Sequence, residues 1–328
     1  MNGNLLSIRD LKVHFPIRQG AFGGVFRLLK AVDGVDLEIG HGETLALVGE
    51  SGSGKSTLGA AVVGMQKPTS GQIVFDGDEI GQDRESAKRR MRDIQIVFQD
   101  PVSALNPRMD IGDSIAEPLA IHGVGSHQER RRRVGDLLEL VGINPHHADR
   151  KPGTFSGGQR QRIVIARAIA LQPKLLVLDE PVSALDVSIR SQILNLLLEL
   201  QQRLGLSYLF ISHDLSVVRH FADRVAVMYL GRLAETGRTA NVFSHPAHPY
   251  TEALLSAVPL PDPKAQRMRQ RIILQGDLPS PANPPSGCRF STRCPIVEPI
   301  CREISPSQQP VRPMQQAACH LRTPAMQT

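Results

Sequence analysis

The chain has 328 residues, of which 41% are hydrophobic, enough for one large α/β domain and a smaller module. Its net charge of +6 comes from 38 basic and 32 acidic residues, a balance that fits nucleic acid, an anionic membrane surface or scattered surface arginines. No run of about 18 apolar residues exists, so no membrane-spanning helix is expected. The first residues lack the basic and apolar regions of a signal peptide, and we expect a cytoplasmic location.

The first 48 residues are predicted to form mainly β-strands. Residues 5–15 alternate between apolar and polar side chains, as an edge strand does. A loop that carries glycine and phenylalanine is expected over residues 20–29, and a second strand over 32–43 that ends in a Gly-His-Gly turn. Residues 44–48 are apolar and strand-like, and they lead directly into a glycine-rich segment.

That glycine-rich segment matches the phosphate-binding pattern G-x-x-x-x-G-K-[ST] at every fixed position. Glycines let backbone N–H groups approach phosphate oxygens, and the helix predicted over residues 57–63 adds its positive N-terminal dipole. Lys55 can reach the β- and γ-phosphates, and the Ser56 hydroxyl can bind Mg²⁺. The predicted ATP-binding residues here are Gly49, Glu50, Ser51, Gly52, Ser53, Gly54, Lys55, Ser56 and Thr57.

The remaining elements alternate between strand and helix on both sides of a mainly helical stretch. In order, we expect a strand at 71–77, a helix at 84–92, a strand at 94–98, helices at 111–122 and 129–141 within the stretch 101–167, a strand at 174–179, a helix at 187–204, a strand at 207–212, a helix at 214–222 and a strand at 224–229. The strand at 174–179 is continuously apolar, as a buried parallel strand is. This order predicts an α/β fold with a parallel sheet and an inserted helical subdomain.

Two carboxylates follow the apolar strand at 174–179. Asp179 is placed to hold Mg²⁺ through its water shell, and Glu180 can polarise a water in line with the γ-phosphate. A pair of strand-end carboxylates that simply face solvent is the alternative, which the phosphate loop upstream disfavours.

A second helix start with exposed N–H groups lies 23 residues before Asp179. Ser156 is a good N-cap residue, and Gly157 and Gly158 leave the helix start open before Gln159. Together with the phosphate loop, this segment resembles the signature of the ABC ATPases, which usually reads Leu-Ser-Gly-Gly-Gln. Phe155 replaces the leucine and keeps the position apolar.

The resemblance covers roughly residues 5–240 and implies roles for further residues. Gln99 resembles the Q-loop glutamine that reaches Mg²⁺ and the attacking water, and His213 resembles the switch histidine on the γ-phosphate. Phe15 is the candidate for stacking on adenine, although a structural phenylalanine is nearly as good an interpretation and Phe22 and Phe26 compete. The segment that resembles the D-loop consists of Ser183, Ala184, Leu185 and Asp186.

A narrower resemblance involves the segment 99–108 and the run His-Pro-Ala-His-Pro-Tyr at 245–250. Both are similar to the ATPase subunits of bacterial oligopeptide and dipeptide importers, and the loop before residue 31 is similar to one of the two paired subunits. In that family the segment after Gln99 contacts coupling helices of the membrane subunits. Relatives import nickel or glutathione, so the cargo stays open.

All four cysteines lie in the last part of the chain: Cys288, Cys294, Cys301 and Cys319. Their Cys-x5-Cys-x6-Cys-x17-Cys spacing lacks the tight pair typical of zinc, and a reducing compartment disfavours disulfides. Four thiolates in an irregular loop suit an iron–sulfur cluster, and the importer resemblance implies [4Fe–4S]. Four free thiols in a packed tail and a zinc site remain the alternatives.

We therefore interpret the chain as the ATP-hydrolysing subunit of an ABC importer for peptides. The resemblance implies an ABC-type phosphate-loop core with an antiparallel β subdomain over residues 1–240, its helical subdomain at about 101–167, and a small irregular cysteine module over 241–328. It implies ATP and Mg²⁺ as cofactors, and a peripheral place on the cytoplasmic face of the inner membrane. The implied partners are a second ATPase subunit in a head-to-tail dimer, two membrane permeases and a separate peptide-binding protein.

The rival interpretation is a soluble ABC ATPase that acts on nucleic acid in repair or translation. The basic charge fits such a protein, but those ATPases generally carry two cassettes or large insertions, and this chain has one phosphate loop. We expect no nucleic-acid partner. A phosphate-loop kinase or GTPase is disfavoured because it would not need the segment 156–159.

Overall fold

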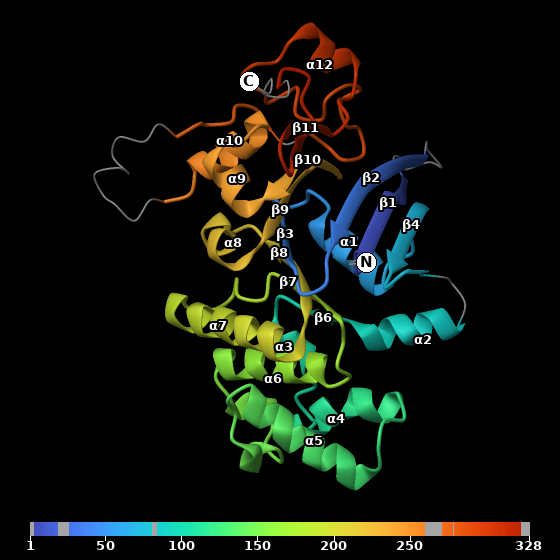
Figure 1. Ribbon diagram of the computed structural model, residues 1–328, viewed down its shortest axis with the longest axis vertical. Helices are drawn as coiled ribbons and strands as arrows, with labels where there is room; N and C mark the ends of the chain where they lie inside the picture. The colour runs from blue at the N-terminus through green and yellow to red at the C-terminus, as the bar shows by residue number, and fades with distance from the viewer. Residues whose placement is uncertain (1–2, 19–25, 81–83, 260–270, 278, 323–328) are drawn as a thin grey trace. The chain divides into compact units, whose positions relative to one another are not determined.

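The computed structural model describes residues 3–18, 26–80, 84–259, 271–277 and 279–322 (Figure 1). Two compact units make up the chain. The first contains residues 40–43 and 80–210, and the second contains residues 3–39, 44–79 and 211 onwards. Among the described residues, none of the helices combines the length and the apolar character that a membrane span requires.

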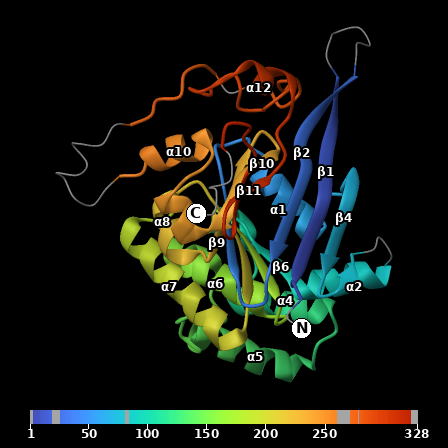
Figure 2. The same ribbon diagram turned by 45° about the horizontal axis from the view of Figure 1, so that its top comes forward.

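In the second unit, a twisted antiparallel sheet has the strand order β2-β1-β4-β5 (Figure 2). Its strands are β1 (Leu6–Arg18), β2 (Phe26–Ile39), β4 (Ser70–Phe75) and β5 (Asp78–Glu79). The alternation of buried residues along β1 is interrupted between Ile8 and Leu11, where the register shifts against both neighbours. Gly71 is required there, because a Cβ atom on it would lie 2.4 Å from the Asp10 carbonyl oxygen.

A second set of strands in this unit has the order β11-β12-β10-β9-β3. The strands are β3 (Thr44–Val48), β9 (Arg224–Tyr229), β10 (Arg232–Arg238), β11 (Gln309–Arg312) and β12 (Gln315–Ala317). Strand β3 is buried along its whole length and runs parallel to β9, while β9, β10 and β12 are antiparallel. The helices of the unit are α1 (Lys55–Val63), α8 (Leu215–Phe221), α9 (Thr239–Ser244), α10 (Pro249–Ser256) and α12 (Pro299–Glu303).

In the first unit, β6 (Ile94–Val97) pairs in parallel with β7 (Leu175–Asp179). The helices are α2 (Arg84–Asp93), α3 (Pro101–Ala104), α4 (Ile111–Ile121), α5 (His127–Leu140), α6 (Gly157–Ile169) and α7 (Val187–Leu204). Helix α4 packs against α5 and α6 through buried residues such as Ile115, Leu138 and Ile165 (Figure 1). Strand β8 (Ser207–Ser212) carries the chain from the first unit into the second.

Most predicted elements occur within a few residues of their expected bounds. The largest differences concern two segments. Strand β2 already begins at Phe26, inside the predicted loop 20–29, whose residues 20–25 lie outside the described part of the chain. The C-terminal segment is more regular than the sequence predicts, because α9, α10, α12, β11 and β12 form there. These elements are short, so they leave no clear periodicity in the sequence.

Candidate functional site

The glycine-rich segment forms a tight loop between β3 and α1, as the sequence predicts. Gly54 is the N-cap residue of α1 and has a φ of 107°, which favours glycine. Neighbouring backbone also excludes side chains. A Cβ atom on Gly49 would lie 2.1 Å from the Met228 carbonyl oxygen, and one on Gly54 would lie 2.0 Å from that of Ala31. The loop is therefore shaped by contacts from outside itself.

Lys55 is buried at the start of α1, and its ammonium group is held by the loop. The Nζ atom donates to the carbonyl oxygens of Gly49 at 2.8 Å and Glu50 at 2.9 Å. The loop also closes on itself and on the turn between β9 and β10. The Ser53 N–H donates to the Glu50 carbonyl at 3.2 Å, and the Ser53 carbonyl accepts from the Gly231 N–H at 2.8 Å. In the same loop, Ser51, Gly52 and Ser56 are exposed. The loop therefore places a buried ammonium group close to exposed loop residues.

Glu50 joins this loop to the C-terminal segment. Its N–H donates to the Tyr250 hydroxyl at 2.8 Å, and its carboxylate accepts from the Arg293 guanidinium at 2.8 and 3.3 Å. Burial alone would lower the pKa of Arg293, but the hydrogen bonds to Glu50 raise it above its ordinary value. The ion pair thus stabilises the charged arginine.

In the first unit, Asp179 ends β7 and Glu180 follows it with a φ of 49°, an uncommon value for a non-glycine residue. The Glu180 carbonyl accepts from Ser183 N–H at 3.2 Å and from the Ser183 hydroxyl at 3.0 Å. These bonds form a turn that leads through Asp186, the N-cap residue of α7. Both residues are half-buried, and the roles of their carboxylates stay predictions.

Ser156 begins α6 with a capping box, as its residue type predicts. The Ser156 hydroxyl accepts from Gln159 N–H at 3.3 Å, and the Gln159 side chain accepts from Ser156 N–H at 3.0 Å. Gly158 is buried against α7, where a Cβ atom would lie 2.5 Å from Ile189 Cγ2. Phe155 is 4% exposed, so the phenylalanine keeps the apolar character of its position.

The other predicted residues lie at strand ends or on β1. Gln99 is exposed two residues after β6, and His213 is exposed directly after β8. Phe15 is half-buried on β1, opposite Leu29 of β2. Phe22 lies outside the described residues. The role of each of these residues stays a prediction.

The four cysteines lie within the second unit, and all are free thiols. Burial raises the pKa of Cys288 to about 11 and also raises those of Cys294 and Cys319, despite backbone N–H donors to these sulfur atoms. Within the described part of the chain, no three His, Cys, Asp or Glu side chains are grouped so that they could hold a metal ion. The geometry therefore does not support the predicted [4Fe–4S] cluster.

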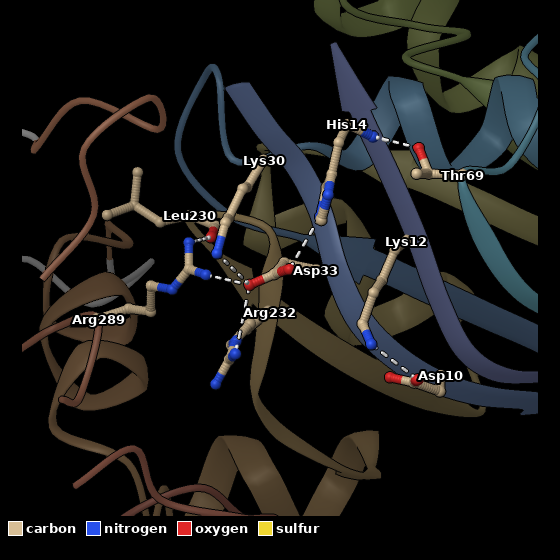
Figure 3. Close-up of polar contacts among 9 residues, drawn as sticks. All are labelled: Asp10, Lys12, His14, Lys30, Asp33, Thr69, Leu230, Arg232 and Arg289. Carbon is tan, nitrogen blue, oxygen red and sulfur yellow. Dashed lines mark hydrogen bonds and ion pairs between the residues drawn. The ribbon is translucent and has the colours of Figure 1, made fainter. Parts of the chain in front are cut away.

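A cluster of charged side chains surrounds the buried Asp33 of β2 (Figure 3). Its carboxylate accepts from Arg289, from Arg232 at 3.2 Å and from His14 at 2.8 Å, with Lys30 Nζ at 4.0 Å. Burial would raise the pKa of Asp33, but the Arg289 guanidinium and the His14 hydrogen bond lower it below its ordinary value. The cluster ties the cysteine segment to β1 and β2.

Sequence reasoning missed Asp33, Arg289, Arg293 and the role of Tyr250. Each looks like an ordinary polar residue in the sequence, because its hydrogen-bond partner lies 200 or more residues away along the chain. The sequence offered one indication of these contacts, the two arginines next to Cys288 and Cys294, but the interpretation of that segment considered only the cysteines.

The chain matches two protein-family models and is similar to curated proteins over nearly its whole length. Residues 32–183 match the model of the ABC transporter family, and residues 234–301 match that of the oligopeptide/dipeptide transporter C-terminal region. The oligopeptide transport ATP-binding protein AppF of Bacillus subtilis is 51% identical, over 97% of this chain and 97% of the relative. This chain belongs to the ABC transporter ATP-binding proteins. The Escherichia coli family member OppF, also described as an oligopeptide transport ATP-binding protein, is 53% identical over 92% of each chain.

Solved structures of ABC proteins share the fold. CbiO1 from Clostridium perfringens, part of an ABC transporter complex, has a TM-score of 0.64 at 33% identity, covering 74% of this chain and 91% of that chain. A dimeric ATP-binding cassette bound to ADP and Pi has a TM-score of 0.62 at 29% identity, covering 71% of this chain and 98% of that one. The ABC protein described here is thus an ATPase of this fold, with ATP and Mg²⁺ as fitting cofactors.

We expect Asp33→Asn to lower the free energy of unfolding by about 3 kcal/mol, because it leaves the buried Arg289 without its anion. Urea unfolding of the full chain measures this loss. The matched control is Asp10→Asn, which removes an exposed carboxylate from the ion pair with Lys12 on the same sheet. Asparagine tolerates the positive φ of Asp10, and exposed pairs contribute little, so its effect should be much smaller. Equal losses in the two variants would contradict the role of Asp33.

The destabilisation caused by Asp33→Asn should depend on pH. A carboxyl group whose pKa is lowered by folding stabilises the folded state above its unfolded pKa, and this contribution is lost as the pH falls through the folded value. The stability gap between the wild type and Asp33→Asn should therefore narrow as the pH falls below about 4.

Proposed function

We propose that the protein is the ATP-hydrolysing subunit that energises import of peptides across the cytoplasmic membrane, acting peripherally on its cytoplasmic face. The observation that carries this proposal is the match of residues 234–301 to the oligopeptide/dipeptide transporter C-terminal region, together with relatives that align over nearly the whole chain. ABC ATPases of other functions share the core, but this C-terminal match supports peptide transport. Dipeptides, oligopeptides, nickel and glutathione remain the candidate cargoes.

The residues of the second unit bind the nucleotide in this proposal. Backbone N–H groups of the loop 49–57 wrap the phosphates, Lys55 neutralises the β- and γ-phosphates, and Ser56 binds Mg²⁺. The buried position of Lys55 beside the loop carbonyls and the exposed Ser56 hydroxyl support these roles. Phe15 stacks on adenine, and His213 contacts the γ-phosphate.

The residues of the first unit carry the chemistry. Glu180 polarises the attacking water, while Asp179 and Gln99 complete the shell of Mg²⁺. The assignments of Asp179 and Glu180 are supported by their position at the end of β7, where both residues are half-buried.

A second ATPase subunit, proposed to be a paralogue of this chain, completes each site in a head-to-tail dimer. The signature residues 156–159 of one subunit close over the γ-phosphate of the other, and residues 183–186 form the D-loop. The exposed start of α6 supports the first role, because the dipole at a helix N-terminus favours an anion. Two permeases and a separate peptide-binding protein are the further partners.

Glu180→Gln should retain ATP binding but lower ATP turnover by about 10²-fold or more, because the water loses its polarising carboxylate. Lys55→Ala should instead weaken nucleotide binding. Phosphate release by the assembled transporter measures turnover. Glu199→Gln, which changes an exposed carboxylate on α7, is the matched control and should leave turnover unchanged. Near-normal ATPase activity of Glu180→Gln would overturn the catalytic assignment.

The segment 101–108 should couple ATP hydrolysis to the permeases. It directly follows Gln99, and it exposes Val102 and Ser103 on α3, whose start is fixed by the Asp100 side chain. Ser103→Cys should therefore cross-link to a membrane subunit, while Ser191→Cys on the exposed face of α7 should not. A transport-competent assembly in which Ser103→Cys forms no such cross-link would argue against this coupling role.

The proposal extends to the four cysteines of the C-terminal segment. Four free thiols in one segment are the ligand type of a [4Fe–4S] cluster, and the sulfur atoms would have to come together to hold it. The expected result is about four irons per chain in protein purified without oxygen, and loss of iron in Cys301→Ser. Stoichiometric zinc would favour a zinc site, and metal-free protein with a protease-resistant tail would favour packed thiols.

A further inference from the structure

Two side chains of the C-terminal segment hold the second residue of the phosphate loop. Tyr250 of α10 accepts the Glu50 N–H at 2.8 Å, and Arg293 donates two hydrogen bonds to the Glu50 carboxylate at 2.8 and 3.3 Å. Glu50 is thereby fixed through both its backbone and its side chain. We propose that Arg293 and Tyr250 are positioning residues for the phosphate loop, so that the C-terminal segment sets the affinity of the loop for ATP.

Both contacts are shielded from water. The Tyr250 side chain is fully buried, and the Arg293 side chain is 10% exposed, against 30% for Glu50. Two parallel hydrogen bonds between a guanidinium and a carboxylate restrict orientation as well as distance. Shielding makes their loss costly, because either charge would remain partly buried without a partner.

The anchors themselves are held in place by further packing. The Tyr250 ring packs against Tyr229 and Phe290, with ring centroids 4.7 and 5.4 Å apart. The buried Glu235 fixes the start of α10, since its carboxylate accepts from the N–H groups of Ala247 and His248 at 2.9 and 2.8 Å. The position of the Tyr250 hydroxyl is therefore built into the core and does not depend on a mobile side chain.

Glu50 connects Tyr250 and Arg293 to the groups that bind phosphate. The Glu50 carbonyl accepts from Lys55 Nζ at 2.9 Å and from Ser53 N–H at 3.2 Å. A shift of Glu50 therefore moves both the Lys55 ammonium group and the loop backbone. In the proposed function, on which this inference rests, these groups bind the phosphates. Small misplacements of such groups weaken binding strongly, because every N–H donor must meet its oxygen at once.

The test is calorimetric titration of the full chain with Mg²⁺ and a non-hydrolysable ATP analogue. Arg293→Gln should weaken binding about tenfold, the size of one lost charge-assisted hydrogen bond. Arg322→Gln is the matched control, because it breaks an ion pair between the same segment and Glu252 of α10 without touching the loop. Thermal unfolding without nucleotide shows whether either variant disturbs the fold.

A double-mutant cycle separates positioning from a general loss of structure. The losses from Glu50→Gln and Arg293→Gln should not add, whereas those from Glu50→Gln and Arg322→Gln should add. Equal affinities of Arg293→Gln and Arg322→Gln would overturn the inference. If Arg293→Gln fails to fold, Tyr250→Phe removes only the hydroxyl, and unchanged affinity in that variant would overturn the inference too.

Lys55→Ala distinguishes a failure of the phosphate-loop assignment from a failure of the positioning role. Unchanged nucleotide affinity in Lys55→Ala would refute the phosphate-loop assignment itself. Weakened affinity in Lys55→Ala, with wild-type affinity in Arg293→Gln and Tyr250→Phe, would refute only the positioning role.

Discussion

A loop that wraps phosphate with backbone N–H groups cannot hold its own shape with side chains, because side chains would block the phosphate. Its shape must come from its surroundings. Here the Met228 and Ala31 carbonyl groups lie where side chains of Gly49 and Gly54 would be, and Gly231 N–H binds the Ser53 carbonyl. Tyr250 and Arg293 complete this support at Glu50, whose N–H donates to the Tyr250 hydroxyl and whose carboxylate binds Arg293.

The C-terminal segment therefore does more than follow the ATPase core. Its arginines bind two different acidic residues of the second unit, Asp33 on β2 and Glu50 in the loop. Such buried pairs contribute little net stability when they form but are costly to break, so they favour one arrangement over others. This property suits a segment that must keep a loop in one shape.

The fold and the local motifs could be predicted because their information is local. The phosphate loop needs glycines at fixed spacing, the α6 cap needs Ser156 and Gln159 three residues apart, and β3 and β7 are continuously apolar. The C-terminal contacts could not be predicted, because they join residues such as Glu50 and Arg293 that no periodicity connects. The cysteines show the opposite limit: four cysteines in one segment and the resemblance to the importer family predicted a metal cluster, yet the described residues form no metal-binding group.

Native-state hydrogen exchange tests most directly whether the loop and the C-terminal segment open as one unit. The informative amides are Glu50, bonded to Tyr250, and Cys288, bonded to the Cys301 carbonyl at 2.8 Å. Our account predicts equal free energies of opening for these two amides, and an equal decrease of both in Asp33→Asn. An open state in which the Cys288 amide exchanges while the Glu50 amide stays protected would contradict it.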